Sequence, residues 1–179
     1  MRRILLAILF AASALVATAQ QAPAPALDPL QLCAREFGES FKLDPKFSPM
    51  LADLDGDSQE DLVLVATSRN VLGGELDYHY RTIDPYDAYF GWGDPKVTVQ
   101  FAATNAVVTR YLLVAHNWRA PKAKFVIINL PFEKLSIARL VRKKKTLNTI
   151  HAEEMGGLAS DVFWDGKKYK WTPSYMAND

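Results

Sequence analysis

Residues 53–66 read Asp-Leu-Asp-Gly-Asp-Ser-Gln-Glu-Asp-Leu-Val-Leu-Val-Ala, an acidic stretch that runs directly into an apolar one. Asp53, Asp55, Asp57 and Asp61 would repel one another if they packed together without a counter-charge. A hard divalent cation accepts oxygen ligands from alternating positions of a tightly wound loop. These four aspartates are therefore candidate metal ligands, and the apolar residues that follow them predict a β-strand.

The EF-hand is the nearest alternative for such a loop. An EF-hand has glycine at its sixth position and a bidentate glutamate at its twelfth. Counted from Asp53, these positions are Ser58 and Leu64. A strand is expected after the loop where an EF-hand has a helix, so the sequence argues against an EF-hand.

The pattern Asp-x-Asp-Gly-Asp-x-x-x-Asp-Leu resembles the calcium loop of FG-GAP or VCBS repeats over about residues 48–67. The resemblance implies a Ca²⁺ ion in a loop between two antiparallel strands. The four aspartates would be side-chain ligands, the carbonyl of Gln59 a backbone ligand, and Gly56 would allow the tight turn. Ser58 stands where the family often has glycine. The chain carries one copy of the loop, and a propeller of at least four four-stranded blades is too large for it, so only the local motif is carried over.

The first residues have the pattern of a cleavable signal peptide. Two arginines precede the apolar run 4–16, and Ala17-Thr18-Ala19 has small residues at the positions that a signal peptidase requires. The run is shorter than the about 20 apolar residues that a membrane-spanning anchor needs. We expect a signal peptide at 1–19, a Pro/Ala linker at 20–27 and a single β-rich domain at 28–179. The protein is thus predicted to be secreted or periplasmic, without stable membrane insertion after cleavage.

The charge balance bears on the choice of partner, and the cysteine content bears on how the core is stabilised. The chain has 21 basic and 20 acidic residues, for a formal net charge of +1. This balance gives no argument for a nucleic-acid partner. Cys33 is the sole cysteine, so an intrachain disulfide framework is excluded and burial must hold the core together.

The predicted fold class is mainly β, an antiparallel sheet or sandwich of six to eight strands with a short N-terminal helix. Asp28-Pro29 predicts the start of that helix and Gly38 its end. Apolar or alternating runs predict the strands, and Asp165-Gly166 predicts a two-residue type I′ turn in a C-terminal hairpin. The expected strands are 62–66, 96–100, 107–115, 124–130 and the hairpin 162–171, whereas 135–141 could be strand or short helix and 147–157 helix or loop.

An aromatic and acidic segment, residues 77–94, is the candidate ligand surface. Aromatic faces beside carboxylates suit sugar rings or cationic groups, so the predicted partner is a protein or a glycan. The other interpretation is a long loop that uses its rings to pack on the core, and we favour it because the segment carries no recognised ligand-binding motif. The candidate ligand-binding residues are Tyr78, Tyr80, Tyr86, Tyr89 and Trp92.

No established catalytic motif occurs in the sequence. The histidines His79, His116 and His151 are too scattered for transition-metal spacing, and His151 beside Glu153 and Glu154 is more typical of surface polarity. The favoured function is a calcium-binding β domain, a binding or structural module whose ion braces a hairpin. The alternatives are a calcium-dependent hydrolase with its site at residues 77–94 and an envelope structural protein without a ligand.

Overall fold

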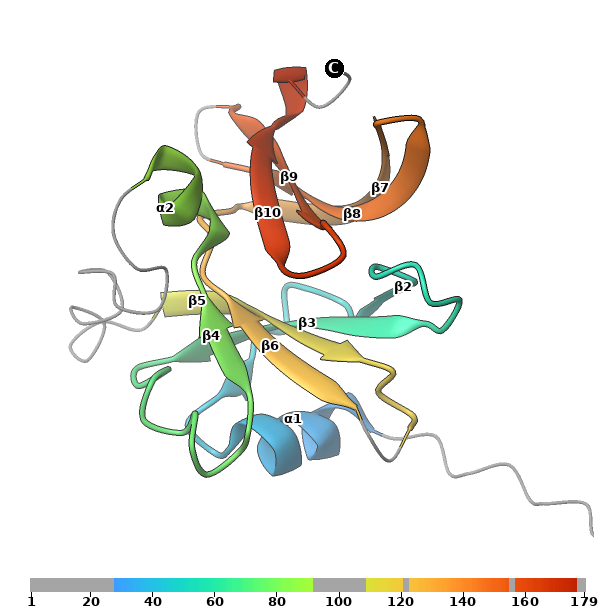
Figure 1. Cartoon of the computed structure of the whole chain (residues 1–179). Coiled ribbons are helices and arrows are strands. Elements are labelled where there is room, and N and C mark those ends of the chain that lie inside the picture. The colour runs from blue at the N-terminus through green and yellow to red at the C-terminus, as the bar shows by residue number, and fades with distance from the viewer. Residues whose placement is uncertain (1–27, 92–108, 121–122, 155–156, 177–179) are drawn as a thin grey trace, which may run out of the picture.

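The computed structural model describes residues 28–91, 109–120, 123–154 and 157–176, which form two β-sheets and two α-helices (Figure 1). The first sheet, sheet A, has the strand order β1-β3-β5-β6-β4, with β2 also paired to β3. Its strands are β1 (Lys42–Leu43), β2 (Met50–Ala52), β3 (Asp61–Ser68), β4 (Arg81–Ile83), β5 (Thr109–His116) and β6 (Lys124–Ile128).

The second sheet, sheet B, is an antiparallel meander with the order β10-β9-β8-β7. Its strands are β7 (Lys134–Arg142), β8 (Lys145–Glu153), β9 (Ala159–Trp164) and β10 (Tyr169–Pro173). The helices are α1 (Pro29–Phe37) and α2 (Pro85–Phe90), and a 3-10 turn, Ser174–Met176, follows β10. No helix in these described ranges is long and apolar enough to span a membrane.

The mainly β class with a short N-terminal helix is confirmed. The described residues contain ten strands, more than the expected six to eight, because β1, β2 and β4 have only two or three residues and no periodic pattern. Pairing is antiparallel except between β4 and β6, which run parallel.

Sheet A is the middle layer of the molecule. Successive side chains of a strand point to opposite faces, so a strand buried on both faces reads as a continuous apolar run. In β3, Leu62 and Leu64 belong to the core on the α1 side, whereas Val63 and Val65 belong to the core shared with sheet B. This arrangement gives three layers, with α1 on one face of sheet A and sheet B on the other (Figure 1).

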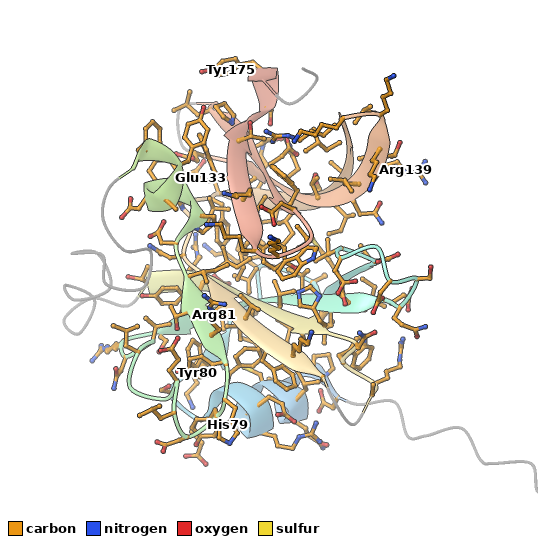
Figure 2. All side chains as sticks on the ribbon, in the orientation of Figure 1. His79, Tyr80, Arg81, Glu133, Arg139 and Tyr175 are labelled. Carbon is orange, nitrogen blue, oxygen red and sulfur yellow. The ribbon has the colours of Figure 1, made fainter. Side chains whose placement is uncertain are left out.

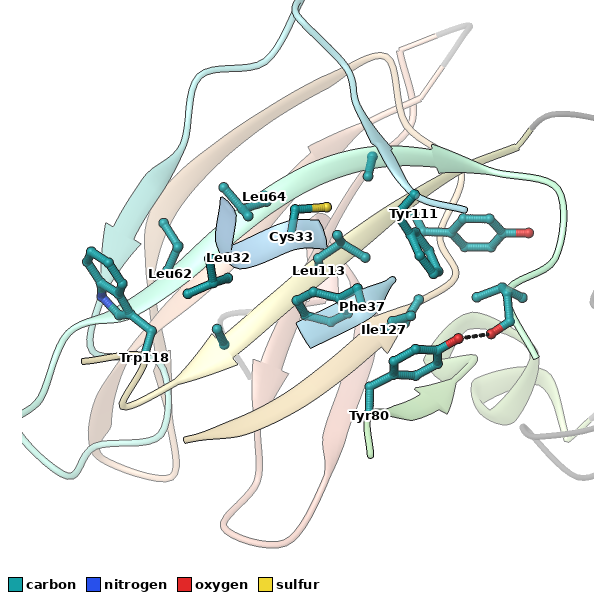
Figure 3. Packing of buried hydrophobic residues seen from close by; sticks show 14 residues of the cluster. Leu32, Cys33, Phe37, Leu62, Leu64, Tyr80, Tyr111, Leu113, Trp118 and Ile127 are labelled. Atoms are coloured by element: carbon teal, nitrogen blue, oxygen red, sulfur yellow. Dashed lines mark hydrogen bonds between the residues drawn. The ribbon is translucent and has the colours of Figure 1, made fainter. Parts of the chain in front are cut away.

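Helix α1 closes the outer face of sheet A. The Asp28 carboxylate accepts the N–H of Leu30 at 3.0 Å, and Pro29 occupies the first helical turn, as the sequence predicts. The helix buries Phe37 against Leu113 and the rings around it (Figure 3). Burial raises the pKa of the Cys33 thiol to about 11, so this cysteine is a neutral core residue.

Several local predictions are resolved in sheet B. Residues 135–141 form part of β7, and most of 147–157, left open between helix and loop, lies in β8. The predicted C-terminal hairpin is present, but the predicted two-residue type I′ turn is wrong. Trp164 pairs with Tyr169, which leaves a four-residue loop in which only Gly166 has a positive φ, of 97°. The Asp165 carboxylate organises that loop by accepting two backbone N–H groups. The predicted strand 96–100 lies outside the described residues.

Candidate metal centre

The acidic loop, residues 53–60, joins β2 to β3, which pair antiparallel with Ala52 opposite Asp61. Carboxylate oxygens of this loop accept hydrogen bonds from backbone N–H groups of the same loop. The two oxygens of Asp53 accept the N–H groups of Gly56 at 2.7 Å and Ser58 at 3.0 Å. Gly56 and Ser58 have φ values of 81° and 71°, which turn the chain tightly enough to gather the carboxylates.

The last aspartate, Asp61, is fully buried at the start of β3. Its Oδ2 accepts the N–H of Leu54 at 2.9 Å, and its Oδ1 accepts the N–H of Asn117 at 3.1 Å. A buried carboxylate is tolerated when hydrogen bonds replace its lost hydration. Asp61 therefore ties both ends of the acidic loop and the end of β5 together.

His116 joins this cluster from the neighbouring strand. Leu62 pairs with Ala115, so the next step of the β3–β5 register sets Asp61 beside His116. The Nδ1 atom of His116 lies 3.1 Å from Asp61 Oδ2 and 3.5 Å from Asp55 Oδ2. Its Nε2 atom lies 3.0 Å from the hydroxyl of Tyr169 in sheet B.

The electrostatics of the loop differ from one carboxylate to the next. Burial, followed by the neighbouring charge of Asp61, raises the pKa of Asp55. The pKa of Asp57 is lowered, first by a hydrogen bond from the Asn117 side chain at 2.7 Å and then by the N–H of Gln59. Burial and the charges of Asp61 and Asp55 raise the pKa of Tyr169 well above its usual range. Asp55 and Tyr169 thus both lie where burial and neighbouring carboxylates disfavour a further negative charge.

The predicted ligand residues fall into two groups that share Asp55. Asp53, Asp55 and Asp57 each offer a carboxylate oxygen, and these oxygens lie within 4.8 Å of one another. Asp61 instead groups with Asp55 and His116, again within 4.8 Å. Gln59 is exposed in the loop beside them. Acidic groups in this arrangement are able to bind a metal ion.

Sequence reasoning missed three polar residues of the site, which the fold brings from distant positions. His116 and Asn117 arrive through the register of β5, and Asn148 reaches across from β8, where its Nδ2 donates to the carbonyl of Asp53 at 2.8 Å. No local spacing links these residues to the loop. Only the strand pairing, which the sequence does not state, would have found them.

Among the described residues, the aromatic side chains predicted to bind a ligand do not form one common surface. Tyr80 is buried against Phe37, and its hydroxyl donates to the carbonyl of Val71 at 2.7 Å (Figure 3). Tyr78 packs on the same core. Tyr86 and Tyr89 lie on α2 and pack against Trp171 of β10. Trp92 lies outside the described residues.

A second polar cluster has the residue types of a hydrolase but a different geometry. Ser174 Oγ donates to Asp161 Oδ2 at 2.9 Å, and His151 Nδ1 lies 3.1 Å from Asp161 Oδ1 and 3.4 Å from Ser174 Oγ. A catalytic triad uses one ring nitrogen for the serine and the other for the acid. Here one nitrogen faces both, so the cluster lacks the arrangement that activates a serine.

A cleft of about 950 Å³ lies on the other side of His116 from the acidic loop. Residues of β4, β6, α2 and the β9–β10 hairpin line it, and Figure 2 labels two of the lining residues, His79 and Arg81. Asp84 is the one acidic side chain among the residues lining it, and this carboxylate is buried beside Asn129. The cationic residues of the cleft are Arg81, Lys124, Lys167, Lys168 and Lys170, and the rings of Trp164, Tyr169 and Trp171 lie among them.

Ser58 provides a test of the loop geometry in the metal-free protein. A β-branched residue at a positive φ costs about 1–3 kcal/mol, whereas glycine adopts it freely. We expect Ser58→Val to lower the free energy of unfolding by about 1–3 kcal/mol, and Ser58→Gly to leave it within about 0.5 kcal/mol of the wild-type value. Urea denaturation in the presence of a chelator measures both. Equal stability of the two variants would rule out the left-handed conformation at this position.

Comparison with known proteins found no matching family model, no matching curated protein and no matching solved structure. The FG-GAP or VCBS resemblance therefore stays a prediction from residues 48–67. The functional argument rests on the geometry of the acidic loop and of the cleft.

Proposed function

We propose that the chain is a calcium-binding β domain, a binding or structural module in which one ion braces the β2–β3 hairpin. The observation that carries this proposal is the cluster of carboxylate oxygens from Asp53, Asp55 and Asp57, all within 4.8 Å of one another. Calcium takes six to eight oxygen ligands and tolerates irregular geometry. Asp61 and the carbonyl of Gln59 complete the proposed ligand set.

A second observation at the acidic loop supports an ion that prefers oxygen ligands. The side-chain oxygen of Asn117 is buried without a hydrogen-bond partner, while the nitrogen of the same amide donates to Asp57. An unsatisfied buried oxygen costs about 1–3 kcal/mol unless a cation, water or donor reaches it. Asn117 thus adds an amide oxygen, which is a calcium-type ligand, beside the carboxylates.

The position of the loop explains why an ion would act as a brace. The loop follows β2 and precedes β3. Its Asp57 accepts a hydrogen bond from Asn117, directly after β5, and its Asp53 carbonyl accepts one from Asn148 of sheet B. A cation that neutralises its carboxylates removes their mutual repulsion and strengthens the junction of the two sheets. We therefore assign the ion a structural role.

We also propose that the protein is exported to the periplasm or secreted. The support is the sequence pattern of residues 1–19, with its basic start, apolar run and small-residue cleavage site. Compartments outside the cytoplasm contain enough calcium to fill extracellular sites that bind with dissociation constants of about 10⁻⁴–10⁻³ M. Export and a calcium brace are therefore consistent with each other.

As a second function we propose that the cleft binds an anionic partner, such as an acidic glycan. The support is the excess of cationic over acidic side chains in its lining, together with the rings of Trp164 and Trp171. Lysine and arginine attract anionic groups, and aromatic faces stack on sugar rings. The overall charge of the chain is close to neutral, so such binding would be confined to this surface.

Calcium should stabilise the purified protein. At a calcium concentration about 100 times the dissociation constant, binding contributes about 2.7 kcal/mol and raises the melting temperature by about 5–10 °C. Asp55→Asn should lose most of this increase, because Asp55 is shared by both groups of ligands. The exposed residue Asp77 supplies the matched control, Asp77→Asn, which should respond like the wild type. Identical melting curves in calcium and in chelator would refute the calcium proposal.

Export predicts a defined N-terminus. Intact-mass measurement of the protein produced in a bacterial host should show cleavage after Ala19, leaving Gln20 as the first residue. Ala19→Arg should block the processing, because the peptidase requires a small residue at that position. A mature protein that retains residues 1–19 would contradict the export proposal.

The anionic-ligand function can be tested with dextran sulfate as the probe and neutral dextran as the uncharged comparison. The double variant Lys124→Glu/Lys168→Glu changes one lining residue in β6 and one in the β9–β10 hairpin, and it should weaken dextran sulfate binding by about tenfold. Lys143→Glu, in the β7–β8 turn away from the cleft lining, is the control and should bind like the wild type. An equal loss in all variants would assign the binding to general surface charge, which favours the envelope structural alternative.

A further inference from the structure

The Nδ1 atom of His116 is a buried polar atom without a hydrogen-bond partner. The side chain is 4 % exposed, and Nδ1 lies 3.1 Å from Asp61 Oδ2 and 3.5 Å from Asp55 Oδ2. Neither oxygen lies in a direction that forms a hydrogen bond with this nitrogen. Burying an unsatisfied polar atom costs about 1–3 kcal/mol, so such an atom in a folded protein needs an explanation, and a bound ion is one.

The three side chains are spaced as the ligands of a small metal ion. Zinc binds nitrogen and carboxylate oxygen at 2.0–2.2 Å, and tetrahedral geometry then sets neighbouring ligand atoms about 3.3 Å apart. The two distances from His116 Nδ1, 3.1 and 3.5 Å, lie on either side of this value. One atom from each of Asp55, Asp61 and His116 lies within 4.8 Å of the others.

The other nitrogen of His116 is already held in the way that a metal ligand requires. A metal-binding histidine usually gives its second ring N–H to a fixed acceptor, which sets the tautomer and the ring orientation. Nε2 lies 3.0 Å from the Tyr169 hydroxyl. The imidazole also stacks on the Tyr169 ring at 5.6 Å and contacts the Trp164 ring at 5.5 Å. A proton on Nε2 leaves the lone pair of Nδ1 free for an ion.

We propose that Asp55, Asp61 and His116 form a second metal site, for a first-row transition-metal ion of the zinc class, with a fourth position left for water or an external ligand. The nitrogen donor carries the assignment, because imidazole suits zinc, copper, iron and nickel whereas calcium takes oxygen ligands. The inference uses the acidic loop of the proposed function but makes a separate statement about the ion. Asp55 and Asp61 belong to both ligand sets, so the two ions compete for them.

Cobalt serves as the optical probe of this site, because Co²⁺ replaces Zn²⁺ and absorbs visible light according to its coordination. We expect the purified protein to bind one Co²⁺ that zinc displaces and that calcium weakens. His116→Gln should lower the Co²⁺ and Zn²⁺ affinities at least about a hundredfold and keep the calcium-induced rise in melting temperature. His79→Gln, at an exposed histidine, is the matched control and should leave cobalt binding unchanged.

A measurement on protein with His116 intact keeps the test independent of the folding of His116→Gln. The chain has three histidines, so the double variant His79→Gln/His151→Gln retains only His116. Zinc-edge X-ray absorption of this variant should show imidazole scattering, with metal–ligand distances of about 2.0–2.2 Å. A coordination shell of oxygen alone, or no zinc binding, would overturn the proposal.

The outcomes separate this inference from the calcium function. Calcium stabilisation without zinc or cobalt binding would sink the second site and leave the calcium brace. Zinc binding that depends on His116, without any calcium effect, would support the second site and refute the calcium brace. If His116 serves only as a charged partner of Asp61, His116→Gln lowers the melting temperature in chelator while zinc affinity is unaffected, and this result also overturns the proposal.

Discussion

The arrangement of the site depends on the burial of the Asp61 carboxylate and on the hydrogen bonds that this carboxylate accepts. An ionised carboxylate loses several kcal/mol of hydration on burial, so it must be surrounded by donors. The N–H groups of Leu54 and Asn117 supply two donors from two segments of the chain, and the His116 ring lies 3.1 Å from the same carboxylate. These contacts with the Asp61 carboxylate close the acidic loop, fix the start of β3 and hold the end of β5 beside it.

The middle position of sheet A gives the loop its connection to the rest of the molecule. Strand β3 is buried on both faces, and sheet B contacts the acidic loop through Asn148 and the neighbouring His116 through Tyr169. A charge change at the loop therefore acts on the contact between the two sheets. The ion that we propose at the outer carboxylates, which are more exposed than Asp61, would therefore act on this contact.

The parts of the structure that were predictable are those encoded within a few neighbouring residues. The cap at Asp28, the strand after Asp61 and the clustering of Asp53, Asp55 and Asp57 follow from local spacing. His116 is one of three histidines scattered along the sequence, and only the β3–β5 register sets it beside Asp61. In the aromatic segment, residues 77–94, Tyr80 packs on α1 and Tyr86 on Trp171, because the two halves of the segment meet different cores. Long-range pairing, which no local pattern encodes, decided both cases.

His116 also connects the acidic loop to the cationic cleft. Its Nδ1 atom faces Asp55 and Asp61, and its Nε2 atom faces Tyr169, which lines the cleft together with His116 itself. A metal ion on Nδ1 requires the ring proton to stay on Nε2, so the Tyr169 oxygen must accept it and the tyrosine proton must turn elsewhere. Without the ion, the proton can occupy Nδ1 instead, and the tyrosine hydroxyl then donates to Nε2. The direction of a hydroxyl in the cleft thus depends on whether the loop on the far side of the imidazole holds a metal ion.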